Sequence, residues 1–193
     1  MNAKNTVQIG GIFSTQDFTF RLSQRDDELD KLVNRFENSG NSNFIQGFAQ
    51  WKHRFNNRLT LNAGMHYSLL TLNNAMALEP RASLSWQINK RQRLSVSTGL
   101  HSKQEHLALY LLEGTLDDGT VIKQKKNLGL TKSYHNVLGY DYVFSPKLRL
   151  KAEAYYQYLY NIPIDKAADG NNSLVNATDI YGMVGIEDAV PDG

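Results

Sequence analysis

The sequence contains no cysteine and only 4 prolines among its 193 residues. Without cysteine, the chain can form no disulfide, no thiolate metal site and no cysteine nucleophile. The longest apolar run, LALYLL at 107–112, is far shorter than the ~18 residues of a membrane-spanning helix. The first residues lack the apolar stretch of a signal peptide. A net charge of +2 provides no general attraction for nucleic acid.

The chain is instead rich in tyrosine, with ten residues, and it carries segments whose polarity alternates. In LRLKAEAYYQYLYN (148–161), one set of alternate positions holds leucine, alanine and tyrosine, and the other holds Arg149, Lys151 and Glu153. A strand places alternate side chains on opposite faces, whereas a helical period would mix these charges with the leucines. The segment is therefore predicted to be a strand with one apolar and one charged face.

Six further segments repeat this alternation with varying clarity, and together they predict about seven strands. They are 4–13, 43–55, 58–72, 78–89, 93–103 and 133–145. Longer connections, at 14–42 and 104–132 with a moderate turn region at 73–77, alternate with short polar turns at 56–58, 89–92 and 145–147. No strand is predicted after residue 162.

Tight turns at one rim and long loops at the other are typical of outer-membrane barrels. Strands of roughly 10 to 13 residues also suit a tilted membrane crossing better than a soluble sheet. The predicted fold is all-β: about seven strands of a larger antiparallel, up-and-down transmembrane β-barrel, with long external loops. Alternation alone leaves open a soluble β-sheet module, with a binding or structural role, that buries one face.

The charges indicate which face would meet lipid, because an Arg or Lys at the bilayer midplane costs ~2–4 kcal/mol. The residues predicted to face the lumen are Arg81, Asp141, Arg149, Lys151 and Glu153. The opposite set, predicted to face lipid or to form aromatic girdles at its interfaces, is Trp86, Tyr142, Phe144, Leu148, Leu150, Tyr156 and Tyr158.

Three ordered stretches in the C-terminal half carry a more specific signal: LEPRASLSWQINKRQRLSVSTGLHSK (78–103), LGLTKSYHNVLGYDYVFSPKLRLKAEAYYQYLYNIPID (128–165) and SLVNATD (173–179). In this order they resemble the distal barrel of TonB-dependent outer-membrane receptors, in the group with an N-terminal carboxypeptidase-regulatory-like domain. Such receptors have barrels of about 22 strands around a plugged lumen. No plug domain, TonB box or signal peptide is recognisable, so residues 1–193 are interpreted as a partial outer-membrane barrel.

The resemblance implies uptake of a scarce nutrient of the siderophore, cobalamin or oligosaccharide class across the bacterial outer membrane. The partners it implies are outer-membrane lipid, the small nutrient ligand and a TonB-type energy-coupling protein that acts through the missing regions. No enzymatic activity, cofactor or nucleic-acid partner is expected. A plugless outer-membrane barrel, either a porin or a barrel enzyme, is the alternative within the same fold.

No catalytic or metal-binding motif stands out, since the sequence contains neither a GxSxG elbow nor an HExxH pair. Three residues lie where a predicted strand passes into the long segment 104–132, at the predicted external rim. These candidates for substrate contact are His101, Lys103 and His106. The basic stretch KQKKN (123–127) is interpreted as a solvated loop or an attraction for anionic surface sugars.

The facing assignment predicts unequal effects for two neighbouring substitutions. Leu150→Arg should impair membrane assembly of the complete protein far more than Lys151→Leu, because only the first places a charge against lipid, at ~2–4 kcal/mol. The fraction of protein recovered in the outer membrane measures the effect. Equal losses for the two variants would contradict the assignment.

Overall fold

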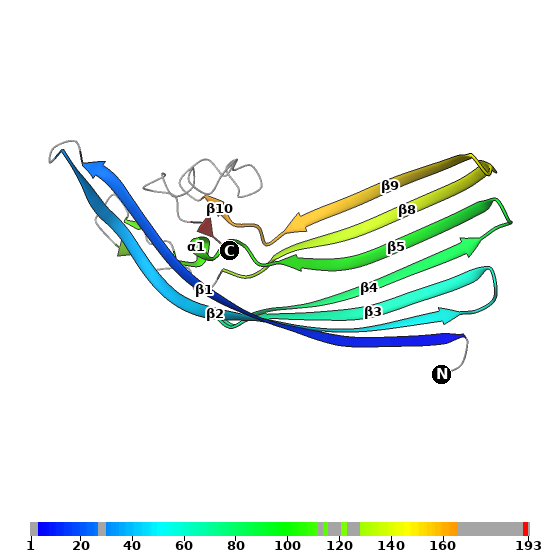
Figure 1. Cartoon of the computed structure of the whole chain (residues 1–193), viewed down its shortest axis with the longest axis horizontal. Coiled ribbons are helices and arrows are strands. Elements are labelled where there is room, and N and C mark those ends of the chain that lie inside the picture. The colour runs from blue at the N-terminus through cyan, green and yellow to red at the C-terminus, as the bar shows by residue number, and fades with distance from the viewer. Residues whose placement is uncertain are drawn as a thin grey trace.

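A single antiparallel sheet dominates the computed structural model (Figure 1), which describes residues 4–26, 30–111, 114–115, 121–122, 128–165 and 191–192. Its strands lie side by side in chain order. They are β1 (Asn5–Asp26), β2 (Lys31–Arg54), β3 (Leu59–Leu70), β4 (Ala75–Gln87), β5 (Gln92–Lys103), β8 (Thr131–Ser145) and β9 (Leu148–Tyr160). The sheet is open, with β1 and β9 at its edges. The predicted all-β, up-and-down arrangement of about seven strands is confirmed.

The remaining described elements are short. The long connection after β5 contains helix α1 (Leu107–Leu111) and a two-stranded ladder of β6 (Gly114–Thr115) and β7 (Val121–Ile122). After β9, β10 (Ile164–Asp165) pairs with β11 (Pro191–Asp192). Among the helices of the described residues, none has the length and apolar character needed to cross a membrane.

The prediction of a long connection at 14–42 is wrong, because both halves of that segment continue as strands. β1 and β2 pair with each other from Asn5–His53 to Asp26–Lys31, whereas β2 pairs with β3 only between residues 44 and 54. The β1–β2 hairpin therefore extends beyond the rest of the sheet (Figure 1). Arg21 and Glu37 form an ion pair of 2.6 Å across it. A ribbon without a covered face needs no apolar alternation, which explains why the pattern gave no strand signal there.

Side-chain oxygens shape the short turns at the opposite end of the sheet. The Asn56 carboxamide accepts hydrogen bonds from the backbone N–H groups of Arg58 and Leu59, at 2.8 and 2.9 Å. Asn89 does the same for Arg91 and Gln92, at 2.8 and 3.0 Å. These Asx turns satisfy backbone donors that have no ladder partner, so the predicted tight turns have a local sequence cause.

The connection between β3 and β4 is a tight turn as well, at 71–74, and not the predicted segment 73–77. Asn74 adopts a left-handed backbone with φ of 59°, which asparagine tolerates better than most residues. The Asn73 side chain accepts a 3.0 Å hydrogen bond from the Ala75 N–H. β4 consequently begins at Ala75, three residues before the start of the predicted strand 78–89.

The register keeps apolar residues of neighbouring strands on one face of the sheet, called here the apolar face. Between β3 and β9, one cross-strand row consists of aliphatic residues: Leu61, Leu84, Val96, Leu138 and Ala154. On β2 the row continues with His53. No second layer in the described part of the chain covers this face, and large apolar side chains on it are exposed. They include Val7, Ile9, Trp51, Met65, Leu78, Leu84, Trp86, Val96, Leu138, Leu150 and Tyr156.

The opposite face, called here the polar face, is partly covered at the end that carries the long connections. Residues of α1 and of 128–130 pack there against β3 and β4. The buried cluster is Leu70, Ala77, Leu109, Tyr110, Leu128 and Leu130. Two asparagine side chains hold residues 128–130 in place before β8. Asn73 donates to the Leu128 carbonyl at 2.6 Å and Asn161 to the Leu130 carbonyl at 2.8 Å.

Tyr110 links the start of the long connection to this cluster. Its hydroxyl accepts a 3.3 Å hydrogen bond from the backbone N–H of Glu105, and its ring is 1% exposed. Burial raises the pKa of Tyr110, because the charged phenolate would lose its hydration. The residue therefore stays neutral, and segment 104–111 is anchored to the sheet.

Removing the side chain of Leu109 should release this segment. Leu109→Ala opens a cavity in the cluster, at ~2–5 kcal/mol for a fully buried leucine, so proteolytic cleavage within 104–111 should become faster. Leu78→Ala is the matched control, because Leu78 is 58% exposed on the apolar face. Equal cleavage rates in the two variants would show that the cluster does not hold the segment.

Candidate functional site

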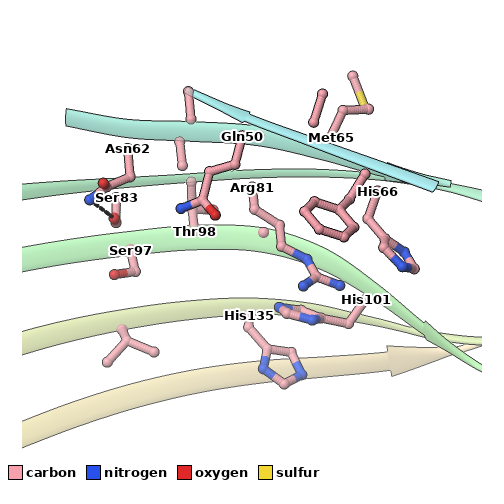
Figure 2. A pocket seen from close by; sticks show the side chains of 17 residues that line it. Gln50, Asn62, Met65, His66, Arg81, Ser83, Ser97, Thr98, His101 and His135 are labelled. Carbon is pink, nitrogen blue, oxygen red and sulfur yellow. Dashed lines mark hydrogen bonds between the residues drawn. The ribbon is translucent and has the colours of Figure 1, made fainter. Parts of the chain in front are cut away.

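A hollow of about 520 Å³ lies on the sheet and is lined by residues of β2, β3, β4, β5 and β8. Figure 2 shows its polar side chains converging from neighbouring strands. They include Gln50, His66, Arg81, Ser97, His101 and His135. Apolar residues also line the hollow, among them Phe48, Met65 and Val137, so the wall offers both hydrogen-bonding groups and apolar contacts to a bound molecule.

Gly99 explains how Arg81 reaches the middle of this hollow. The register places Arg81, Gly99 and His135 in one row across β4, β5 and β8. A Cβ at Gly99 would lie 3.0 Å from the Arg81 Cγ, so the arginine side chain occupies the space that any other residue would fill. Its guanidinium consequently points toward His101 and His135 (Figure 2).

Glu79 holds Arg81 from the other side. The Arg81 Nη2 donates to Oε2 of Glu79, and the Ser102 hydroxyl donates to its Oε1. Oε2 also lies 3.3 Å from the His66 Nδ1, and Glu79 is only 2% exposed. A buried carboxylate needs such partners, because an unpaired buried charge is strongly destabilising. The cluster fixes the direction of the arginine.

Pro80 opens the sheet next to this cluster. The ladder between β4 and β5 runs only from Arg81–Gly99 to Gln87–Arg93, whereas β5 pairs with β8 as far as Lys103–Thr131. Proline has no backbone N–H to donate to a neighbouring strand. Beyond Pro80, the Ser102–Glu79 hydrogen bond connects β5 to β4 in place of the ladder.

Two imidazoles complete the hollow. The rings of His101 and His135 lie 4.6 Å apart between centroids, tilted by 42°. The His135 Nε2 is buried and has no hydrogen-bond partner within the described part of the chain. A buried nitrogen without a partner is unfavourable by ~1–3 kcal/mol, so this atom carries an unmet hydrogen-bonding requirement beside the hollow.

The arrangement around His66 differs from a nucleophilic triad. A triad histidine contacts its nucleophile and its carboxylate through opposite ring nitrogens. Here the same nitrogen, Nδ1, lies 3.4 Å from the Ser68 Oγ and 3.3 Å from Glu79. Ser68 is also 1% exposed, so no substrate can reach its hydroxyl. Within the described ranges, no three His, Cys, Asp or Glu side chains are grouped for a metal ion.

The residues predicted to face the lumen lie on the polar face, but only Arg81 lines the hollow. Arg149 binds Asp141 through two nitrogens, with Nε donating to Oδ1 at 2.6 Å. Lys151 and Glu153 form an ion pair of 2.7 Å along β9. These four residues make a separate charged patch on β8 and β9.

The residues predicted to face lipid or to form girdles lie on the apolar face or beside the short turns. Apart from Tyr142, which is half-buried, all of them are exposed: Trp86, Phe144, Leu148, Leu150, Tyr156 and Tyr158. The rings of Tyr142 and Phe144 stack edge to face, with 4.4 Å between centroids. The sheet thus separates the two predicted sets, whatever surrounds it.

The three predicted substrate contacts do not form one site. His101 lines the hollow, whereas Lys103 pairs with Glu105 at 3.1 Å and the His106 ring lies 5.6 Å from Phe20. Lys103 and His106 line a second cleft, of about 880 Å³, between the β1–β2 hairpin and residues 103–109. The stretches KQKKN (123–127) and SLVNATD (173–179) lie outside the described residues.

Sequence reasoning did not select Glu79, Gly99 or His135 for the site. Alternation does place Glu79 and His135 on the polar side of their strands. The stronger signal would have been the glycine itself, because an isolated glycine inside a strand indicates a close approach by a neighbouring group. The register that brings Gly99 between Arg81 and His135 is a tertiary feature.

Comparisons with known proteins add no assignment: no family model and no curated protein sequence matches the chain.

Loss of the Glu79 carboxylate should destabilise the sheet. Glu79→Ala removes a buried carboxylate that accepts hydrogen bonds from Arg81 and Ser102. Losing a hydrogen bond to a charged group costs ~1.5–3 kcal/mol, so the urea midpoint of unfolding should fall. Glu153→Ala is the control, because its side chain is 50% exposed and exposed ion pairs contribute ~0–1 kcal/mol. A midpoint that moves no more in Glu79→Ala than in the control would show that the Glu79 cluster does not hold the sheet.

Proposed function

We propose that this chain is part of the barrel wall of a TonB-dependent outer-membrane receptor that takes up a scarce nutrient. In this proposal, the apolar face meets lipid and the polar face lines the lumen. The uncovered apolar face is the observation that carries it. A sheet needs a partner for its apolar face, and an apolar surface of this extent is rare on a protein that meets only water.

The length of the strands supports the same proposal. β3, β4, β5, β8 and β9 have 12, 13, 12, 15 and 13 residues. Twelve residues span ~40 Å at ~3.3 Å each, and a strand tilted by ~45° needs about this length to cross a ~30 Å hydrocarbon layer. Ordinary soluble strands average only ~5–6 residues.

The distribution of residues along the strands also supports the proposal. An aliphatic row runs across β3, β4, β5, β8 and β9 from Leu61 to Ala154. Bulky aromatic residues lie beside the short turns, as Phe55, Trp86 and Phe144 do, and toward the other end, as Tyr134 and Tyr158 do. Aromatic residues favour the two lipid–water interfaces. In the proposal, the aliphatic row therefore contacts the hydrocarbon layer and the aromatic residues lie at its two interfaces.

The polar face would then serve the passage of the nutrient. The resemblance to TonB-dependent receptors implies capture at the external end and import by plug movement, driven from the inner membrane. The hollow around Arg81 and the cleft beside His106 both open on the polar face, where such a molecule would pass. The anchored segment 104–111 would narrow the lumen at its external end.

Single-cysteine labelling tests the orientation, since the chain contains no cysteine of its own. Nitroxide labels at Leu84, Val96 and Leu150 should collide with dissolved oxygen in lipid when the complete protein is in vesicles. Labels at their sequence neighbours Ser83, Ser97 and Lys151 should instead meet a water-soluble nickel chelate. A set of six labels that all meet the nickel chelate would exclude the lipid-facing assignment and favour a soluble sheet.

The coding sequence upstream of residue 1 tests the receptor assignment separately. A plug domain and a TonB box are expected there, in frame. An upstream region that encodes further strands but no plug would favour the porin or the barrel enzyme.

A further inference from the structure

We propose that the hollow on the polar face binds an anionic group, a carboxylate or a phosphate, through Arg81, His101 and His135. The assignment of this group to the imported nutrient rests on the proposed function. The binding itself rests on the geometry alone.

The lining of the hollow carries one sign of charge. It includes Arg81 and three histidines but no Asp or Glu. The Glu79 carboxylate compensates part of the Arg81 charge. It is buried and does not line the hollow, and its partners are the side chains of Ser68, Arg81, Ser102 and His66. The lining that a ligand meets therefore presents N–H and O–H donors and the single charged side chain of Arg81, which favour an anion over a cation.

Arg81 has donors to spare. Only its Nη2 binds Glu79, and 45% of its side chain is exposed. A guanidinium offers five N–H donors in a planar fork that matches the two oxygens of a carboxylate or phosphate. Because Glu79 and Gly99 already fix the direction of the side chain, little rotamer freedom is left to lose on binding.

The two histidines provide further contacts beside the guanidinium. The imidazole of His135 lines the hollow, and a neutral imidazole carries one N–H that can donate to an anion. His101 lies against His135 and also lines the hollow. An oxygen placed between Arg81 and the imidazole pair would thus meet donors from β4, β5 and β8.

The size of the hollow sets the kind of molecule. Its volume of about 520 Å³ lies within the ~300–1,000 Å³ of small-molecule sites. Gln50, Asn62, Ser83 and Ser97 line the part away from the histidines and offer amides and hydroxyls. The ligand is accordingly a small polar molecule with one anionic end.

Histidine NMR on the full chain in detergent micelles tests the binding. Inorganic phosphate and succinate should shift the imidazole signals of His101 and His135 in a saturable way, while glycerol, the neutral probe, should not. Arg81→Gln should weaken phosphate binding by about tenfold or more, the effect of losing a charge-assisted hydrogen bond. The control is Arg149→Gln, which removes an arginine outside the hollow and should leave the affinity unchanged. Equal affinities in the two variants, or no saturable shift in the wild type, would overturn the site.

Gly99→Ala provides a second variant that keeps every donor. The added methyl would displace the Arg81 side chain, so binding should weaken although the charge is retained. Circular dichroism of the three variants must show the strand content of the wild type. An unchanged affinity in Gly99→Ala would refute the role of the glycine row.

Titration of the complete receptor separates the two possible sources of the anion. Phosphate binding that persists there supports a nutrient group. Binding that is lost there but retained by the isolated chain would mean that a carboxylate of the receptor itself occupies the hollow, and would overturn the nutrient assignment. The labelling experiment is independent, since an apolar face in lipid without anion binding refutes this site alone.

Discussion

A single sheet cannot cover its own faces, and every feature of this chain depends on how that constraint is met. The backbone ladders join seven strands into one sheet, but nothing in the described part of the chain covers the aliphatic row from Leu61 to Ala154. The register is what keeps these residues together, because a slip by one residue would send a whole strand's apolar set to the opposite face. In the proposed setting, the uncovered face meets lipid, and the lengths of β3, β4, β5, β8 and β9 suit a bilayer.

The polar face meets the complementary demand, since polar groups away from bulk water need partners. The Glu79 cluster does this at the end of the sheet that carries the long connections, whereas the Arg149–Asp141 and Lys151–Glu153 pairs near the edge strand are exposed apart from the Asp141 side chain. Gly99 removes one side chain from this face and so creates room for an arginine to lie across the sheet. The hollow therefore depends on Gly99: because this residue has no side chain, the Arg81 side chain of the neighbouring strand can extend over it.

The sequence was sufficient to predict those strands whose two faces differ in polarity, such as 148–161, because this difference appears in the sequence as a period of two. It failed for 14–42, where the hairpin is held by its own ladder and imposes no apolar period. Arg81 could be placed on the polar face by parity, but its meeting with His135 depends on register across three strands. His101 and His106 show the same limit in reverse: five residues apart in sequence, they belong to different hollows because the chain turns at residue 104.

The proline in β4 gives the sheet a mechanical property that its ladders alone would not have. On one side of Pro80, β4 and β5 are joined by a ladder, and on the other by a side-chain bridge between Glu79 and Ser102. Curvature can change along this line by rotating side chains, without breaking a backbone hydrogen bond. Backbone hydrogen bonds therefore join β4 and β5 near the tight turns, and side chains alone join them beside the Arg81 hollow.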